Sequence, residues 1–357
     1  MLARLATTIA LAALLALGFV PARAAAEPIP VGATTLELSR SLYERLRAND
    51  VHLRALKPGT ARRRALSFPA SSGQIEATYG SGYLFYEGGI KLQVRKRKVV
   101  VTRLILNTTE RWLRAKIGGR EMTIATVEDT SAGWDGFDIA VALNLRLTQR
   151  AANLLNRRLD LDGVFQAGRR LAAADTIVRP ETVGVRGGTI ELVFDPGFLA
   201  KLESLGVAIS TAESAALAGS TLVLPIFQGA ISPDLLRGNL FGESGFALLQ
   251  EGPLPEQVQQ ARFIAIILTL ESDRLDAAIN LPTGLFGGGQ LANVDVNSGA
   301  SHVDPATGSI AARGAIAMLD AGIAAALNDT FATPLGKAGV FVAGEPLAAV
   351  SFTVQTR

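Results

Sequence analysis

The chain contains one sequence pattern twice. Residues 82–92 read GYLFYEGGIKL and residues 238–248 read GNLFGESGFAL, with six identities that all lie 156 residues apart. The closing segments agree as well, because residues 164–178 read VFQAGRRLAAADTIV and residues 340–354 read VFVAGEPLAAVSFTV. Matching segments that keep their order with few gaps indicate a tandem duplication. We therefore expect two copies of one domain, near residues 30–180 and 185–357, and we align TLEL at 35–38 with TIEL at 189–192.

The punctuation within each copy favours β-structure. Gly, Pro, Asn or Asp recurs every ten residues or so, and short apolar or β-branched runs lie between these residues. Such spacing is typical of a sandwich or barrel. Helix signals are few: Ser39 precedes an apolar run, Asp195-Pro196 begins its counterpart, and residues 147–156 and 317–328 form a later pair. The predicted fold is mainly β, with two tandem β-sandwich-like domains that each carry two short helices.

The N-terminus has the pattern of a secretory signal peptide. Arg4 precedes a short apolar run from Ala6 to Val20, and small residues follow up to Ala26. We expect residues 1–26 to be removed, after Ala24 or Ala26, because the run is too short to span a membrane comfortably. The chain has no cysteine, which excludes disulfides, thiolate metal sites and a cysteine-linked lipid. The expectation is a protein that is secreted or held in the cell envelope, with no integral span after cleavage.

Charge differs sharply between the two copies. Residues 27–180 carry 25 Lys and Arg against 15 Asp and Glu, a balance of +10, whereas residues 181–357 carry 8 against 17, a balance of −9. Oppositely charged halves can attract each other or present two different surfaces. Drift between duplicated copies is the simpler alternative. The basic residues are densest at 91–98, which read KLQVRKRK. As one strand, this segment places Lys91, Arg95 and Arg97 on a common face, either for binding acidic partners or for protecting a sheet edge.

Several repeated motifs together resemble a known domain. They are a Thr-Leu/Ile-x-Leu strand with its helix, a Leu-Gly-Val turn at 205–207, a Pro-x-x-x-Gly-x-Ile segment, the Gly-x-Leu-Phe segment, a late helix that ends Leu-Asn, and the closing Val-Phe-x-Ala-Gly-x-x-Leu. With these motifs both copies resemble the haem-transport-associated (HtaA-type) domain of secreted bacterial proteins, over nearly all the mature chain. The resemblance implies a β-rich sandwich that binds haem, with a tyrosine as iron ligand and a histidine beside it.

The residues at these family positions differ between the copies. The family histidine lies in a His-x-Gly-Gly turn, where copy one has Tyr86 and copy two has Gly242. The family tyrosine lies near Tyr43, whose counterpart is Leu199. By this resemblance Tyr43 is the candidate haem-iron ligand, Tyr86 its neighbour, and Lys91, Arg95 and Arg97 the partners of the haem carboxylates. The alternative is that Tyr43 is a helix aromatic and Tyr86 a strand aromatic, with no ligand.

Enzymatic signatures are missing from the sequence. The two histidines, His52 and His302, lie at non-equivalent places, His302 in an expected loop, and no Gly-x-Ser-x-Gly elbow occurs. Basic residues are not interleaved with aromatics as in nucleic-acid-binding proteins. We therefore predict an exported, non-enzymatic binding protein with haem or another anionic ligand in domain 1. The alternative is a structural cell-envelope protein whose oppositely charged domains mediate self-association or polymer binding.

Overall fold

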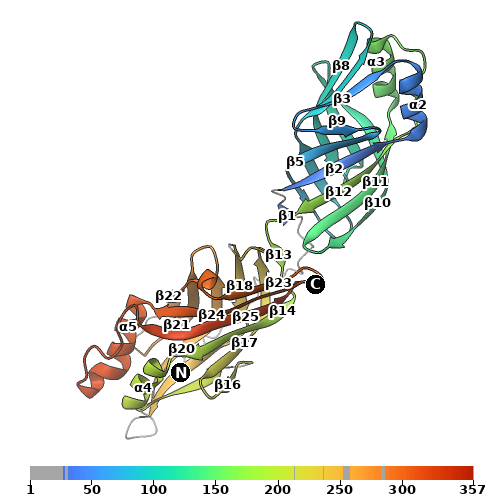
Figure 1. The fold of residues 1–357 in the computed structure, drawn as a ribbon. Helices are drawn as coiled ribbons and strands as arrows, with labels where there is room; N and C mark the ends of the chain where they lie inside the picture. Colours follow the sequence, from blue (N-terminus) through green and yellow to red (C-terminus); the bar gives the residue numbers. More distant parts are fainter. Residues whose placement is uncertain are drawn as a thin grey trace, which may run out of the picture. The chain divides into compact units, whose positions relative to one another are not determined.

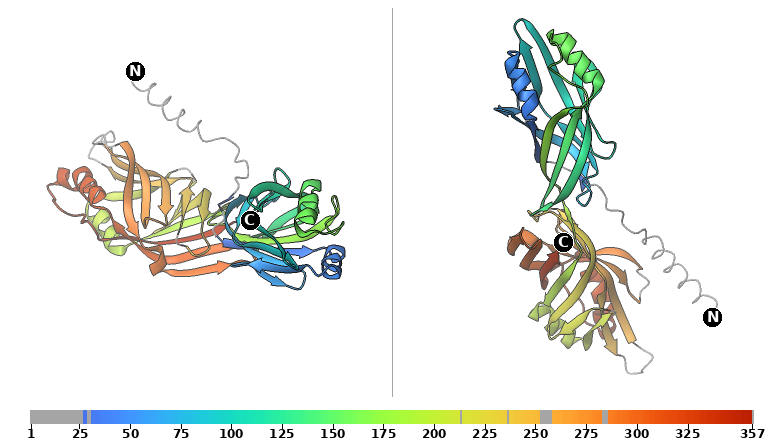
Figure 2. Two further views of the ribbon diagram at one scale, coloured as in Figure 1. Left: turned by 90° about the horizontal axis from the view of Figure 1, so that it is seen from above. Right: turned by 90° about the vertical axis from the view of Figure 1, so that its right-hand side faces the viewer.

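The chain forms two compact units with the same architecture. The computed structural model describes residues 27–28, 31–212, 214–235, 237–251, 258–282 and 286–356, and the expected signal peptide at 1–26 lies outside them. Unit 1 extends to Pro180 and unit 2 begins at Glu181. Both units are mainly β with two short α-helices each, which confirms the predicted fold class. Figures 1 and 2 show that the helices of each unit gather at one end of its sheet.

Unit 1 is a closed sheet. Its helices are α2 (Arg40–Ala48) and α3 (Gln149–Leu159). Its strands are β1 (Glu27–Pro28), β2 (Val31–Leu38), β3 (His52–Leu56), β4 (Thr60–Arg62), β5 (Ala65–Ile75), β6 (Gly82–Tyr86), β7 (Gly89–Val94), β8 (Arg97–Asn107), β9 (Trp112–Ile117), β10 (Arg120–Asp135), β11 (Asp138–Leu147) and β12 (Arg170–Arg179). The order β5-β2-β12-β11-β10-β9-β8 is closed by β6, which pairs with both β5 and β8 and gives an eight-stranded barrel.

Unit 2 repeats this plan. Its α-helices are α4 (Pro196–Ser204) and α5 (Ala321–Leu327), the latter followed by a π-helical turn (Asn328–Ala332) and a 3-10 turn (Thr333–Leu335). Its strands are β13 (Val183–Gly184), β14 (Gly187–Phe194), β15 (Val207–Ala212), β16 (Ala216–Ala218), β17 (Thr221–Ile231), β18 (Gly238–Gly242), β19 (Gly245–Glu251), β20 (Val258–Thr269), β21 (Arg274–Asn280), β22 (Phe286–Val294), β23 (Ala300–Asp304), β24 (Ser309–Leu319) and β25 (Pro346–Gln355), with a 3-10 turn at Val296–Ser298. Here β18 closes the barrel between β17 and β20.

Strand register corrects one detail of the sequence alignment. Leu36 pairs with Leu66 on β5, and Leu192 pairs with Leu222 on β17. Leu36 and Leu192 are therefore equivalent, at the same spacing of 156 that relates the opening motif, and the alignment of residues 35–38 with 189–192 is wrong by two residues. The similarity of TLEL to TIEL misled it, because alternating strands resemble themselves after a shift of two.

Local capping explains where the helices begin. The amide of Leu42 donates a hydrogen bond to the Ser39 hydroxyl at 3.3 Å, and the amide of Gly197 donates one to the Asp195 carboxylate at 2.7 Å. Leu42 and Leu46 of α2 face the barrel interior, as Phe198 and Leu202 of α4 do. Each helix pair thus covers the open end of its barrel with apolar side chains. Within the described residues, no helix has both the length and the apolar character that crossing a membrane requires.

Candidate functional site at the helix end of unit 1

The basic segment at residues 91–98 is a hairpin. Val94 pairs with Arg97 across a turn at Arg95 and Lys96, so the expectation of a single strand is wrong, and Arg95 has a left-handed φ of 49°. Lys91 lies on β7, while Arg95 and Arg97 are exposed at the turn. The suggestion that these cations protect a sheet edge is also wrong, because β7 is paired with β3 on one side and β8 on the other.

Tyr86 lies inside the barrel. Its side chain is 8% exposed, and its hydroxyl is 2.6 Å from the Thr34 hydroxyl, which in turn is 2.7 Å from the Thr176 hydroxyl. Burial raises the pKa of Tyr86 to about 12, against the opposing effect of hydrogen bonds from Thr34 and Thr176. The phenol is therefore neutral at physiological pH, and this arrangement leaves its oxygen no open face for a ligand.

We expect the stability of unit 1 to depend on Tyr86 at high pH. An unfolded tyrosine ionises near pH 10, whereas the folded side chain holds its proton to about pH 12. The contribution of this raised pKa is fully present below pH 10 and is lost as the pH rises through 12. Urea unfolding at several pH values, followed by tryptophan fluorescence, should show a steeper loss for the wild type than for Tyr86→Phe. Equal slopes would contradict the burial of an un-ionised phenol.

Tyr43 has a different environment. It lies half-buried on α2 and packs against the core of unit 1. No hydrogen bond or ring contact joins it to Tyr86 in the described part of the chain, so the structure does not bring the two phenols together. Tyr43 instead shares the helix end with the basic turn, which follows β7 at the same end of the sheet.

An apolar cavity lies beneath α2. It has a volume of about 60 Å³, and no polar side chain lines it. The helices contribute Leu42, Leu46 and Leu155, and the sheet contributes most of the remaining lining. We call this space the helix-end cavity; its other lining residues are Leu38, Leu53, Leu66, Ile90, Leu92, Val101, Ile117, Ile124, Leu147, Phe165 and Leu171.

Unit 2 fills the equivalent space with aromatic rings. Ile90 pairs with Val101 in unit 1, and the equivalent pair in unit 2 is Phe246 with Phe263, whose rings stack with centroids 4.9 Å apart. The positions of Leu38 and Leu42 are likewise taken by phenylalanine. We call the resulting set the aromatic cluster; it comprises Phe194, Phe198, Phe246, Phe263 and Phe341. Sequence reasoning missed this contrast, although position-by-position comparison of the copies displays it.

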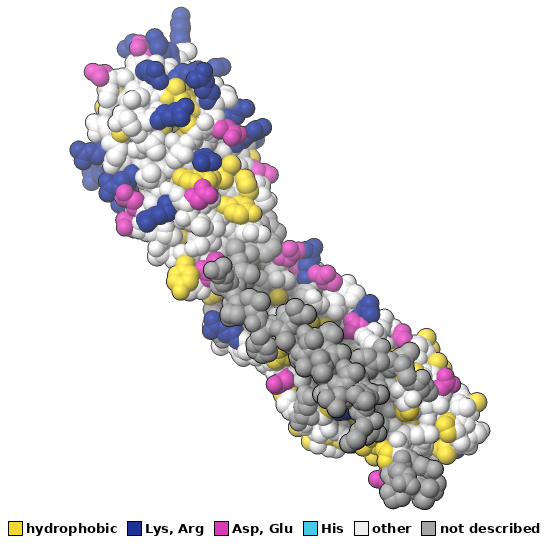
Figure 3. All heavy atoms as spheres, turned by 180° about the vertical axis from the view of Figure 1, so that it is seen from behind, with side chains coloured by type: hydrophobic (Ala, Val, Ile, Leu, Met, Phe, Trp, Pro, Cys, Tyr) yellow, Lys and Arg dark blue, Asp and Glu magenta, His cyan; other side chains and the backbone are white. Residues whose placement is uncertain are grey.

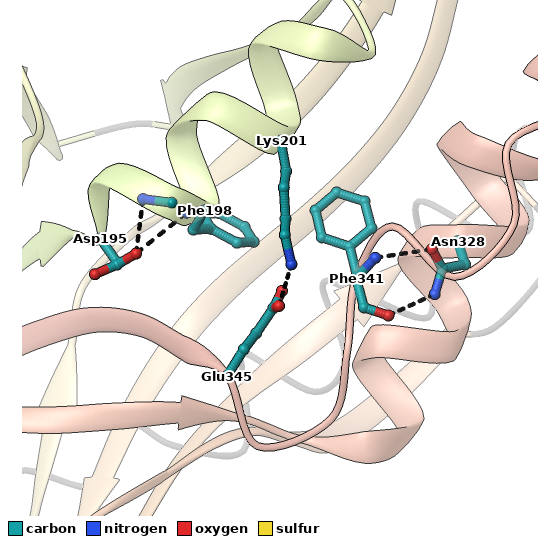
Figure 4. Close-up of polar contacts among 7 residues, drawn as sticks. Asp195, Phe198, Lys201, Asn328, Phe341 and Glu345 are labelled. Atoms are coloured by element: carbon teal, nitrogen blue, oxygen red, sulfur yellow. Dashed lines mark hydrogen bonds and ion pairs between the residues drawn. The ribbon is translucent and has the colours of Figure 1, made fainter.

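The first helix is also held more firmly in unit 2. Lys201 on α4 forms an ion pair with Glu345, and the two side chains are 31% and 16% exposed (Figure 4). The equivalent residues in unit 1 are Arg45 and Arg169, which have the same charge. Arg45 donates instead to the backbone oxygen of Val164 at 2.9 Å. At this position α2 is therefore held by a hydrogen bond to a neutral acceptor in the loop before β12, which is weaker than an ion pair.

The second helix is fastened identically in both units. The Asn156 amide donates to the Phe165 carbonyl at 2.8 Å and accepts from the Phe165 amide at 3.0 Å. Asn328 makes the same two bonds to Phe341, at 2.8 and 3.0 Å (Figure 4). The Leu-Asn motif at the end of the late helix therefore has a structural role that does not depend on a ligand.

A polar pocket opens beside the basic turn. It has a volume of about 550 Å³ and lies between the C-terminal ends of α2 and α3 and the β7–β8 turn. Arg95, Lys96 and Arg97 line one side of it, and three carboxylates line the other, where Arg97 is 3.2 Å from Asp160. The remaining carboxylates are Asp50 and Asp162. Arg95 and Lys96 take part in none of the ion pairs of the described residues, so a ligand there would meet these two cations first.

The two histidines lie on strands of different units. His52 is exposed on β3, and His302 lies on β23 rather than in the expected loop. The described residues contain no group of three or more His, Asp or Glu side chains placed to hold a metal ion.

Comparison with known proteins gives matches among solved structures alone. No family model matches the chain, and no curated protein matches it. The C-terminal domain of HtaA from Corynebacterium glutamicum is similar to this chain with a TM-score of 0.35 and 11% identity, over 43% of this chain and 98% of that domain. The N-terminal domain of HtaA gives 0.33 and 13%, over 48% and 98%. The haem-binding protein HtaB of the same organism gives 0.30 and 12%, over 43% and 95%.

Proposed function

We propose that the chain is an exported, non-enzymatic binding protein and that unit 1 binds haem at its helix end. The observation that carries this proposal is the contrast between the two interiors. One barrel fold closes its end with the aromatic cluster in unit 2 and leaves the helix-end cavity in unit 1. Well-packed interiors rarely leave such space without a reason. Unit 1 is therefore the ligand-binding half, and unit 2 is a closed copy of the same scaffold.

The residues at the helix end suit an amphipathic, iron-bearing anion. The cavity lining is wholly apolar and suits a porphyrin face, while Arg95 and Lys96 at the turn suit its carboxylates. Tyr43 on α2 supplies an oxygen of the kind that holds ferric haem from one axial side. Tyr86 is buried and hydrogen-bonded, and it is not part of this proposal. Haem is much larger than a cavity of about 60 Å³, so binding requires α2 to move away from the sheet.

Movement of α2 is consistent with how the helix is held. Arg45 donates to a backbone oxygen, and Arg169 stands where unit 2 has Glu345, so two like charges occupy the positions of the ion pair of unit 2. Displacing α2 exposes Leu42 and Leu46, and a bound apolar ring would cover the same surface again.

Titration with ferric haem tests the proposal. Purified protein lacking residues 1–26 should show a tyrosinate-type change in haem absorbance, and Tyr43→Phe should weaken the affinity at least tenfold because the axial oxygen is lost. Val101→Phe should weaken it similarly, because Phe263 occupies this position in the filled unit 2. The control is Tyr79→Phe, which changes a tyrosine that is 75% exposed. Absence of a spectral change at saturating haem, or equal effects of Tyr43→Phe and Tyr79→Phe, would overturn the proposal.

A further inference from the structure

Five cations lie on the outer face of adjacent strands in unit 1. Arg54 on β3 pairs in register with Lys91 on β7, and Gln93 beside Lys91 pairs with Lys98 on β8. The alternate residues of these strands, Leu92 and Val99 among them, are buried, so the cations point outward. We call this surface the basic face; its cations are Arg54, Lys91, Lys98, Arg114 and Lys116.

The basic face carries charge that its own fold does not neutralise. None of the ion pairs in the described part of the chain includes any of these five side chains. Glu121 is the carboxylate next to Lys116 across the strands, and it pairs with Arg103 at 3.5 Å. Uncompensated like charges on neighbouring strands repel one another, so an external anion would stabilise them. Figure 3 shows Lys and Arg side chains crowded over unit 1 on the side it draws.

Unit 2 shows that the fold does not need these cations. The register that pairs Arg54 with Lys91 pairs Ser210 with Ala247 in unit 2. The position of Lys98 is taken by Gln260. The positions of Arg114 and Lys116 on β9 are taken by Asp276 and Ala278 on β21. The positions of the five cations are therefore neutral or acidic in unit 2, where Arg262 stands in the place of Val100.

Aromatic side chains lie next to the basic face. Tyr83 and Phe85 on β6 are 38% and 39% exposed and meet edge to face with centroids 5.6 Å apart. The Arg114 guanidinium lies over the ring of Trp112 on β9, with its Cζ 4.2 Å from the ring centroid. Through Ile105 and Asn107 of β8, these residues stand in the same rows of the sheet. Tyr and Trp with Lys and Arg are the residues that proteins place at the headgroup level of a bilayer.

We propose that the basic face docks unit 1 on an anionic lipid surface. The cations spread over β3, β7, β8 and β9 rather than following one groove, so they match a two-dimensional array of phosphates better than a single polymer strand. The aromatics gather at one side instead of alternating with the cations as stacking platforms for bases do. Docking of this kind is independent of haem and brings unit 1 to a membrane without a spanning segment.

Vesicle sedimentation tests the docking. Protein lacking residues 1–26 is mixed with vesicles of phosphatidylglycerol and phosphatidylcholine, or of phosphatidylcholine alone, at low and high salt. The wild type should bind the anionic vesicles and lose affinity as salt rises. The variant R54S/K91A/K98Q carries the residues of unit 2 at the same positions, so the fold tolerates them, and it should lose roughly a hundredfold in affinity because three cations leave the surface.

A charge-matched control separates the face from net charge. R150Q/R157Q/R170Q also removes three exposed cations, on α3 and β12, and should lose less than about threefold. Failure of the wild type to bind anionic vesicles, or equal losses in the two variants, would overturn the proposal. The proposal would also be overturned if the wild type binds a single-stranded oligonucleotide or a second copy of the chain, and R54S/K91A/K98Q abolishes that binding but still binds the vesicles. Unchanged melting temperatures of both variants confirm that folding is intact.

Discussion

Replacing Tyr86 by glycine should destabilise unit 1 by roughly 4 kcal/mol, and two further changes should restore most of that loss. Removal of a buried aromatic ring costs about 3–5 kcal/mol, and glycine within a strand adds up to about 1 kcal/mol. Unit 2 nevertheless folds with Gly242 at this position. There Ile190 and Phe352 occupy the places of Thr34 and Thr176, and both are buried and paired in register, as the two threonines are. The ring lost from the closing strand is thus supplied by the last strand.

A set of variants measures this exchange. Tyr86→Gly alone leaves a cavity and removes one of the two hydrogen-bond partners of the Thr34 hydroxyl. Adding Thr34→Ile and Thr176→Phe removes the hydroxyls and returns a ring, so the triple variant should recover at least half of the lost free energy of unfolding. Both tryptophans, Trp112 and Trp134, lie in unit 1, so urea unfolding followed by tryptophan fluorescence reports this unit alone. A triple variant no more stable than Tyr86→Gly would show that the units fill their cores independently.

The duplication made the fold predictable from the sequence. A motif that recurs with the same glycines marks equivalent strand turns, and Ser39 and Asp195 mark the helix starts by their capping chemistry. The aligned copies also showed the difference that produces the cavity, because the positions of Leu38 and Ile90 correspond, 156 residues later, to Phe194 and Phe246. The side-chain volume at each position could be predicted from the sequence, but which positions contact each other depends on strand register.

Side-chain direction was the part that sequence reasoning lacked. Tyr86 belongs to a strand whose side chains alternate between the two faces of the sheet. Which face is the interior follows only from the pairing of β6 with both β5 and β8, and this pairing places Tyr86 inside and Phe85 outside. The turn at Arg95 was hidden because no glycine or asparagine marks it; an arginine adopts the left-handed conformation instead. Tyr43 and Tyr86, which the sequence analysis considered as a pair, therefore lie apart: Tyr86 is in the barrel core and Tyr43 is on α2.

The aromatic cluster of unit 2 should be essential to its stability. Changing Phe246→Ile and Phe263→Val installs the residues of unit 1 and should cost roughly 4 kcal/mol, because two fully buried rings are truncated and their stack at 4.9 Å is lost. Unit 2 contains neither tryptophan nor tyrosine. Its unfolding is therefore seen by circular dichroism and not by tryptophan fluorescence. The dichroism transition of unit 2 should shift to lower urea, while the fluorescence transition of unit 1 stays in place.

Phe227→Val provides the matched control, because Phe227 is 58% exposed and its loss should change stability by less than about 0.5 kcal/mol. The variant with Phe246→Ile and Phe263→Val should also gain a dry apolar cavity. Benzene should bind in this cavity and stabilise the variant, because such cavities bind small apolar ligands. It should not gain a tyrosinate haem spectrum, since Leu199 stands where unit 1 has Tyr43. A variant that keeps its stability and does not bind benzene would mean that the two rings do not fill the end of the barrel. The contrast between the units would then no longer support assigning ligand binding to unit 1.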